Sequence, residues 1–155
     1  MRRSGTLDID PAFVSRPARI AIASEKGEVF GLLYPPANPG AKGPAWKKPP
    51  LIISLHGGPT TAAARGLKPR TLFFTSRGFS WLDLDYSGST GYGRGYRDRL
   101  KGEWGVADVE DTVSAAQFAV SEALADANAI FVTGGSAGGY TVLMAIASAS
   151  VFRGA

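Results

Sequence analysis

Short apolar runs alternate with longer amphipathic stretches along most of this chain. Five runs have the length and the β-branched content of strands, and they fall at residues 18–24, 29–34, 51–55, 79–85 and 128–133. Three stretches show helical patterns, at residues 72–77, 106–124 and 140–149. Because continuous apolar strands alternate with helices after a first strand pair, the pattern predicts an α/β domain with a mostly parallel sheet.

The pattern also divides the chain into two parts. Residues 1–16 show no clear periodicity, and we expect them to form a linker or an extended lead-in segment. Residues 17–155 hold all of the strand and helix patterns, and they open with an antiparallel hairpin that turns at residues 25–28. At 155 residues, 45% of them hydrophobic, the chain is long enough for one domain with a buried core.

Composition narrows the classes of function. The sequence contains no cysteine, which excludes a disulfide scaffold and cysteine-based metal or redox chemistry and fits a cytoplasmic protein. The net charge of +4 is scattered, and because no basic face repeats at helical spacing, we expect no nucleic-acid partner. The sequence has no apolar run of about 18 residues, so we expect no membrane span.

Ser136 lies in a G-x-S-x-G pattern between the last predicted strand and the last predicted helix. A serine in this position sits on a turn so tight that Gly134 and Gly138 must lack side chains. Its hydroxyl is then held above the sheet, beside the first backbone N–H groups of the helix. A helix cap is the alternative, but a cap does not require glycines on both sides. We therefore predict that Ser136 is a catalytic nucleophile.

A second glycine motif, His56-Gly57-Gly58-Pro59, directly follows the strand at residues 51–55. Loops of this kind supply backbone N–H groups to an oxyanion hole, where they stabilise the negative charge of a tetrahedral intermediate. We assign the Gly58 N–H as one donor, with Gly57 as the second choice, and the Ala137 N–H as the other donor. A plain glycine turn at the end of a strand is the alternative.

His56, Asp108 and Ser136 occur in the chain order of a trypsin-like protease triad. Those proteases are all-β, whereas helical patterns flank both the acid and the serine here. We therefore assign His56 to orienting the oxyanion loop rather than to proton transfer. Asp108 and Asp111 fall at a helix start, where carboxylates interact favourably with the helix dipole, and we interpret them as structural. The glycine-rich stretch at residues 86–96 lacks the G-x-G-x-x-G pattern and predicts a structural loop at the rim of the site.

Four motifs in this order resemble those of the prolyl oligopeptidase family. They lie at residues 56–59, 86–93, 104–105 with Asp108, and 134–140, and the resemblance covers roughly residues 17–155. Within the family, the chain looks most similar to the acylaminoacyl-peptidase and dipeptidyl-aminopeptidase-like branch. The resemblance implies the amino-terminal half of an α/β-hydrolase fold, truncated after the nucleophile helix.

The resemblance also implies a function. Members of the family hydrolyse short peptides with a Ser–Asp–His triad and need no metal or organic cofactor. Carried over by position, Ser136 matches the nucleophile, and Gly58 and Ala137 match the oxyanion donors. The family's catalytic Asp and His would lie beyond Ala155, and no histidine follows Ser136 in this sequence. We therefore expect a fragment of a serine peptidase that is inactive when alone.

Two other functions stay open. A carboxylesterase would use the same turn at Ser136 on non-peptide esters, although the loop at residues 86–96 is more similar to that of the peptidases. A non-catalytic pairing module would be completed by another chain. The strand that leads to Ser136 would be an open apolar edge in this fragment, which favours self-association.

Overall fold

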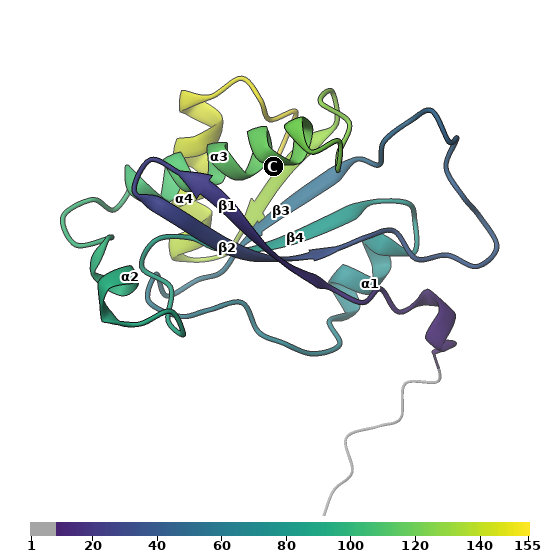
Figure 1. Cartoon of the computed structure of the whole chain (residues 1–155), viewed down its shortest axis with the longest axis horizontal. Helices are drawn as coiled ribbons and strands as arrows, with labels where there is room; N and C mark the ends of the chain where they lie inside the picture. Colours follow the sequence, from purple (N-terminus) through teal and green to yellow (C-terminus); the bar gives the residue numbers. More distant parts are fainter. Residues whose placement is uncertain (1–8) are drawn as a thin grey trace, which may run out of the picture.

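The computed structural model describes residues 9–155, which form one five-stranded sheet with helices on both faces (Figure 1). In chain order the elements are a 3-10 helix η1 (Pro11–Phe13), β1 (Ala18–Ser24), β2 (Gly27–Tyr34), β3 (Leu51–Leu55), α1 (Pro69–Thr75), β4 (Ser80–Asp85), α2 (Arg94–Asp98), α3 (Ala107–Ser121), β5 (Ile130–Gly134) and α4 (Ala137–Ser148). The predicted α/β fold class is confirmed.

The strand order is β1-β2-β4-β3-β5. β1 and β2 form an antiparallel hairpin, β2 runs antiparallel to β4, and β3 is parallel to both β4 and β5. Because β3, β4 and β5 point the same way, the three segments that follow them meet at one edge of the sheet. These segments are the motifs predicted to carry the chemistry.

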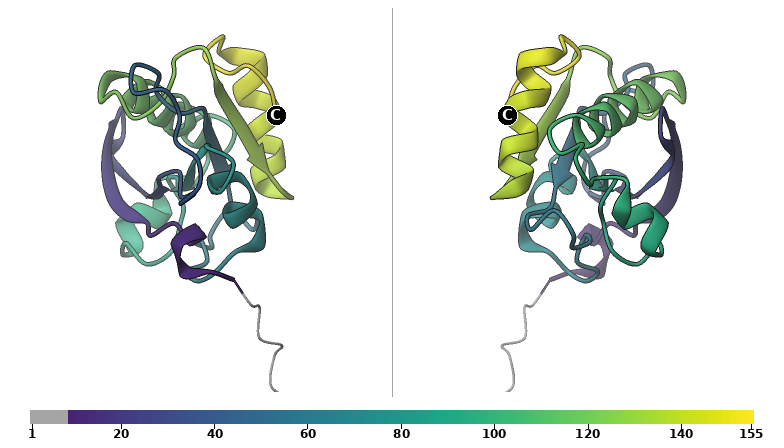
Figure 2. Two further views of the ribbon diagram at one scale, coloured as in Figure 1. Left: turned by 90° about the vertical axis from the view of Figure 1, so that its right-hand side faces the viewer. Right: turned by 90° about the vertical axis from the view of Figure 1, so that its left-hand side faces the viewer.

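The hydrophobic core has two layers, one on each face of the sheet. Alternate residues of β3 show this division, because Leu51, Ile53 and Leu55 pack with α3 and α4, whereas Ile52 packs with Trp81 on the other face. Figure 1 and the side views in Figure 2 show α3 and α4 over one face and α1 on the other. Side chains that alternate along a strand thus bury both faces of the sheet, as expected for parallel strands.

Local features of the fold follow the turn chemistry of the sequence. Ser24 pairs with Gly27, which has a φ of 105°, so the first hairpin closes with glycine where a positive φ is required. α1 begins at Pro69, a residue favoured in the first turn, and it is followed by Gly78 at a φ of 88°. The predicted hairpin and the predicted glycine stop are both confirmed.

Several elements differ from the sequence prediction. α4 begins at Ala137 rather than at residue 140, because its first turn contains glycines that carry no apolar signal. The short helix α2 lies inside the stretch predicted to be a loop. The lead-in contains η1, in which the Asp10 carboxylate accepts the Ala12 N–H at 2.9 Å. Residues 1–8 of the predicted lead-in lie outside the described part of the chain.

The outer edge of β5 is partly covered rather than fully open. The Arg153 N–H donates to the Ile130 carbonyl at 2.8 Å, and the Val132 N–H donates to the Gly154 carbonyl at 3.1 Å. Phe131 and Gly154 form a parallel bridge. The prediction of an open edge along the whole of β5 is therefore wrong for its first half, where residues 153–154 pair with it.

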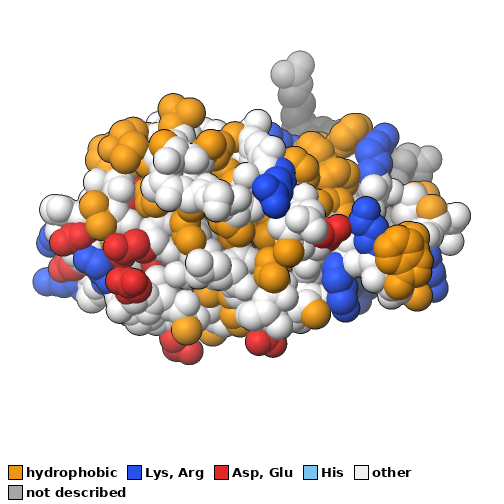
Figure 3. All heavy atoms as spheres, turned by 90° about the horizontal axis from the view of Figure 1, so that it is seen from above, with side chains coloured by type: hydrophobic (Ala, Val, Ile, Leu, Met, Phe, Trp, Pro, Cys, Tyr) orange, Lys and Arg blue, Asp and Glu red, His pale blue; other side chains and the backbone are white. Residues whose placement is uncertain are grey.

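α4 presents apolar side chains to the surface on its outer side. Tyr140, Leu143, Met144 and Ile146 are exposed, and the exposed fraction of Leu143 is 70%. Figure 3 views the molecule from the side of α3 and α4 and shows apolar side chains at this surface. Charged side chains gather toward the two ends of the molecule.

Candidate active site

Ser136 lies between β5 and α4 in a backbone conformation that non-glycine residues rarely adopt. Its φ is 54° and its ψ is −122°, and the residue is exposed. Its side chain makes no hydrogen bond that caps α4 within the described residues. The geometry therefore argues against the helix-cap interpretation. A strained, exposed serine between a strand and a helix matches the turn that the sequence predicted.

The glycines around Ser136 are required by the close approach of three backbone segments. A Cβ atom on Gly134 would lie 2.5 Å from the Gly138 carbonyl oxygen. A Cβ atom on Gly138 would lie 2.5 Å from the Leu55 carbonyl oxygen and 2.6 Å from that of His56. The turn after β5 thus packs directly against the end of β3. A side chain on Gly134 or on Gly138 would prevent this packing.

The glycine loop after β3 lies against the serine. Leu55 pairs with Gly134 in the parallel ladder, so residues 56–58 leave the sheet beside the turn. A Cβ atom on Gly57 would lie only 3.3 Å from the Ser136 Cβ and 3.1 Å from the Gly135 carbonyl oxygen. Gly58 follows with a φ of 56°. The structure therefore brings together the motifs that the sequence analysis placed in one site.

Ala137 is the first residue of α4 and is buried. The first N–H groups of a helix have no acceptor within the helix, and the helix dipole makes this end attractive to negative charge. An oxygen atom placed between Ser136 and the glycine loop would meet such groups. The arrangement can therefore stabilise an anion next to the serine hydroxyl.

His56 contacts the glycine loop and its neighbours through both ring nitrogens. Nδ1 lies 3.1 Å from the Gly57 carbonyl oxygen and 3.1 Å from Thr61 Oγ1, and Nε2 lies 2.7 Å from Ser89 Oγ. Burial lowers the pKa of His56, so the neutral ring is favoured. These contacts support the predicted orienting role and leave neither nitrogen facing Ser136.

Tyr86 is a further support of this loop that the sequence analysis did not single out. Its hydroxyl donates to the His56 carbonyl at 2.9 Å, and its ring stacks on the His56 ring with a centroid distance of 4.5 Å. Tyr86 is fully buried. The sequence did hold a signal for Tyr86, because it is a polar residue directly after a buried strand. Residues at the carboxyl ends of parallel strands lie at the edge of the sheet where ligands bind.

His56, Ser89 and Asp85 have the residue types of a catalytic triad but not its geometry. Ser89 is fully buried, and its hydroxyl donates to the Tyr86 carbonyl at 2.6 Å. Asp85 Oδ1 lies 3.9 Å from Nε2, the same nitrogen that contacts Ser89. In a triad the acid binds the opposite nitrogen of the ring. This cluster is therefore a structural network beneath the loop.

The loop at residues 86–96 is fixed by tyrosines, as a structural loop at the rim requires. The Tyr92 hydroxyl donates to Asp85 Oδ2 at 2.6 Å, and the Tyr96 hydroxyl donates to the Asp85 carbonyl. The Tyr92 ring also stacks on Phe30 at 4.7 Å. Asp85 in addition accepts the Ala63 N–H at 2.6 Å. One buried carboxylate thus ties together two of the loops that surround the site.

Asp108 and Asp111 are buried and structural, as predicted. Asp108 accepts the Gly105 N–H at 2.6 Å and the Thr141 hydroxyl at 2.5 Å, so it joins α3 to α4. Asp111 accepts the Ser24 hydroxyl and the backbone N–H that follows Tyr86. Burial raises the pKa of Asp111. Both carboxylates hold elements in place behind the site.

Within residues 9–155, no helix combines the length and the apolar character that a membrane span requires. Among the same residues, no group of three or more His, Asp or Glu side chains is placed to hold a metal ion.

The strand order, the strained serine and the adjoining glycine loop define an α/β-hydrolase fold, and comparison with known proteins agrees. A family model described as the prolyl oligopeptidase family matches residues 66–155. The chain therefore belongs to the prolyl oligopeptidase family, a family of peptidases, which confirms the resemblance seen in the four motifs.

Three similar proteins are much longer than this chain. Dipeptidyl aminopeptidase BIII of Pseudoxanthomonas mexicana is 30% identical over 138 residues, which cover 88% of this chain and 20% of that protein. Dipeptidyl peptidase family member 6 of Caenorhabditis elegans is 38% identical over 96 residues, covering 62% of this chain and 13% of that protein. A puromycin-hydrolyzing peptidase of Mycobacterium tuberculosis superposes with a TM-score of 0.94 at 42% identity, covering 99% of this chain and 24% of that one. The chain thus spans a quarter or less of the length of these relatives.

Proposed function

We propose that Ser136 is the nucleophile of a serine peptidase that hydrolyses short peptides through an acyl-enzyme. The observation that carries the proposal is the conformation of Ser136, which is strained and exposed directly before α4, with Gly57 packed against it. Family membership and peptidase relatives support the reaction class. An acylaminoacyl peptidase that is 26% identical, with a TM-score of 0.78, is known in complex with Z-Gly-Gly-Phe-chloromethyl ketone, which supports a peptide substrate.

In the proposed reaction, Ser136 Oγ attacks the carbonyl carbon of the scissile peptide bond while its proton passes to a general base. The carbonyl oxygen becomes an oxyanion, which accepts hydrogen bonds from the N–H groups of Gly58 and Ala137. Each such donor is typically worth ~3 kcal/mol at the transition state. Collapse of the intermediate releases the amine with that proton, and water then hydrolyses the ester at Ser136.

The general base is the part that this chain does not supply. His56 is the one histidine of the sequence, and both of its ring nitrogens contact other groups. Removing one member of a triad typically lowers turnover by roughly 10⁴–10⁶-fold. We therefore propose that these 155 residues, taken alone, hydrolyse peptides at least about 10⁴-fold more slowly than a complete enzyme of the family would. The absence of cysteine supports our proposal of a cytoplasmic location.

A chimera tests the proposal. The chain replaces the matching quarter of the Mycobacterium tuberculosis peptidase, whose remaining part supplies the acid and base that family membership implies. We expect hydrolysis of aminoacyl arylamides, lost by at least about 1,000-fold in Ser136→Ala. Ser148→Ala, at the far end of α4, is the matched control and should keep full activity.

The same assay separates the alternatives. Turnover of p-nitrophenyl esters without any turnover of arylamides would favour a carboxylesterase. Arylamide hydrolysis that survives Ser136→Ala would overturn the nucleophile assignment. Absence of both activities in a folded chimera would favour the non-catalytic pairing module.

A further inference from the structure

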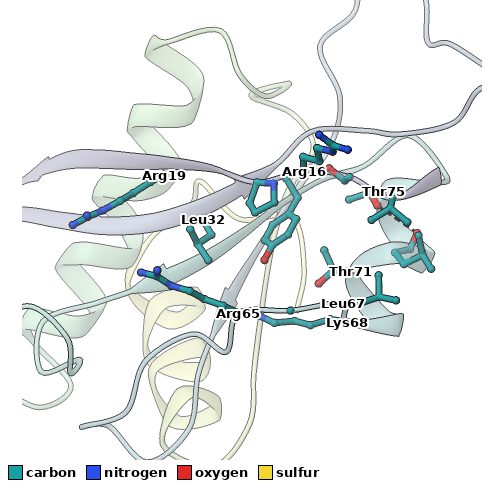
Figure 4. A pocket seen from close by; sticks show the side chains of 14 residues that line it. Arg16, Arg19, Leu32, Arg65, Leu67, Lys68, Thr71 and Thr75 are labelled. Carbon is teal, nitrogen blue, oxygen red and sulfur yellow. Dashed lines mark hydrogen bonds between the residues drawn. The ribbon is translucent and has the colours of Figure 1, made fainter. Parts of the chain in front are cut away.

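A cavity of about 480 Å³ lies away from Ser136, on the face of the sheet that α1 covers. Its walls come from the lead-in segment, β2, the loop before α1, and α1 itself (Figure 4). It shares no lining residue with the glycine loop at 56–58 or with the turn at 134–138. Its volume falls in the range of small-molecule sites. The cavity is therefore a second candidate site, separate from the proposed catalytic one.

The charge of the lining is one-sided. Four basic residues line the cavity, namely Arg16, Arg19, Arg65 and Lys68, and no Asp or Glu is among the described residues that do so. Lys68 is neutralised by Asp83, to which its Nζ donates at 2.5 Å. The three arginines take part in no ion pair within residues 9–155. The lining thus carries three arginines whose charges are not paired directly with a carboxylate of the described residues.

Two of the arginines are placed near each other. In Figure 4 the side chains of Arg19 and Arg65 run toward the same end of the cavity, whereas Arg16 points away from it. Burial and the neighbouring Asp85 raise the pKa of the Tyr92 hydroxyl to about 12, and both Arg19 and Arg65 oppose this rise. The Arg19 guanidinium carbon lies 4.9 Å from the centroid of the Phe30 ring and 5.5 Å from that of the Tyr92 ring.

A buried hydroxyl in the wall lacks a partner. Thr71 is 4% exposed, and its Oγ1 has no hydrogen-bond partner among the described residues. Thr71 lines the cavity together with Leu32 and Leu72. An unpaired buried hydroxyl is unfavourable, and a hydrogen-bond acceptor within the cavity would satisfy it. The wall thus offers an apolar surface, a free hydroxyl donor and two cations at one end.

We propose that this cavity binds a small carboxylate that has an apolar body and a second hydrogen-bond acceptor. The carboxylate pairs with Arg65 and Arg19, whose planar guanidinium groups match its two oxygens. The apolar body packs on Leu32 and Leu72, and the second acceptor takes the proton of the Thr71 hydroxyl. This binding does not involve Ser136, so it can be tested independently of the proposed peptidase activity.

The test is a titration of the ¹⁵N-labelled 155-residue chain, followed by NMR, with three probes. N-acetyl-L-leucine has all three features, N-acetyl-L-leucinamide lacks the charge, and N-acetylglycine lacks the apolar body. We expect N-acetyl-L-leucine to shift the amide signals of cavity residues such as Leu32 and Gly66 saturably. The other two probes should bind at least about fivefold more weakly, because each lacks one of the contacts.

Two variants locate the binding. Arg65→Gln removes an exposed charge and should weaken binding of N-acetyl-L-leucine about fivefold. Thr71→Val keeps the shape of the side chain and removes a hydroxyl without a protein partner, so the chain should stay folded and bind about threefold more weakly. Arg97→Gln, on α2 and outside the cavity, is the matched control and should bind as the wild type does.

The proposal is overturned if N-acetyl-L-leucinamide or N-acetylglycine binds as tightly as N-acetyl-L-leucine. Shifts confined to residues outside the cavity, or no saturable shift at all, would also contradict it. So would affinities of Arg65→Gln and Thr71→Val that stay within twofold of the wild type.

Discussion

Ser136 shows at the scale of one residue how the site is held. A serine at a φ of 54° is strained, at a typical cost of about 1–3 kcal/mol, and the surrounding structure must compensate for it. Gly134 and Gly138 allow this, because the backbones of the turn and of β3 approach more closely than a Cβ atom permits. Packing of the surrounding backbone, rather than the local conformational preference of serine, therefore maintains the strained conformation of Ser136.

The first prediction concerns these glycines. Gly138→Ala should destabilise the fold by more than about 2 kcal/mol, because its Cβ would lie 2.5 Å from a backbone oxygen that cannot move freely. Gly139→Ala is the matched control: its Cβ would lie 3.6 Å from the nearest atom, so alanine should stabilise the helix by up to about 1 kcal/mol. Urea unfolding of both variants checks this. Equal effects of the two substitutions would contradict the account of the turn.

The second prediction concerns His56, whose pKa burial holds below its ordinary value of 6.5. The unfolded chain then binds more protons than the folded one below this pH, so stability should be complete above 6.5 and should fall as the pH drops through that value. Unfolding free energies measured between about pH 7 and pH 5 should show this slope, and His56→Gln should reduce it. An identical slope in the variant would show that His56 is not its source.

At the scale of elements, α3 and α4 form one support for the edge that carries Ser136. The Thr141 hydroxyl of α4 donates to the buried carboxylate of Asp108 at the start of α3. The same carboxylate closes the turn into α3 through the Gly105 N–H. The helix that begins directly after Ser136 is thus fixed to its neighbour by a charged hydrogen bond.

The third prediction follows from this contact. Thr141→Val keeps the side-chain shape and leaves one oxygen of Asp108 without its donor, which should destabilise the fold by about 2 kcal/mol. Ser121→Ala, at the exposed end of α3, should change stability by less than about 0.5 kcal/mol. Urea unfolding provides the comparison. A Thr141→Val variant as stable as the wild type would show that the hydrogen bond between Thr141 and Asp108 does not stabilise the fold.

The elements also show what the sequence could and could not predict. All five strands were predicted because each is a short apolar run, and periodicity is the strongest local signal. For α3, the spacing of Val109, Val113, Ala116 and Val120 in the sequence predicts one face packed on the sheet. Val109 and Ala116 are buried, whereas Val113 and Val120 are only partly buried. Ala115 and Ala119 are buried as well, and their small side chains let the helix approach the sheet.

The parts of the site that could be predicted are those with a backbone requirement. Ser136 and the glycine loop were recognisable because glycine is needed where backbones touch. The support from Tyr86 and Asp85 could not be predicted, because its hydrogen bonds join residues that are 30 and 22 positions apart in the chain. Such pairings depend on the strand order, which the local pattern does not specify.

At the scale of the whole molecule, the outer side of α4 presents apolar surface. Leu143 is 70% exposed, and its neighbours Met144 and Ile146 are exposed as well. Contiguous exposed apolar residues of this kind typically mark a surface that contacts other protein. The longer relatives contain further chain, which is absent from these 155 residues.

The fourth prediction is that the 155-residue chain self-associates through this surface. Light scattering at increasing protein concentration should show a rising mass, and Leu143→Glu should shift the population toward the monomer. Glu122→Lys, a charge change at the end of α3, is the control and should leave the association unchanged. A wild-type chain that stays monomeric at about 100 μM would contradict the prediction.

The central claim is that the hydroxyl of Ser136 is the group that reacts. A fluorophosphonate probe, with the adduct mapped by mass spectrometry, tests it most directly when the isolated chain and the chimera are treated in parallel. We expect one adduct per chimera, on Ser136, and labelling of the isolated chain at least about 1,000-fold slower, because no base accepts the proton there. An adduct on any other residue, or labelling that persists in Ser136→Ala, would contradict the claim.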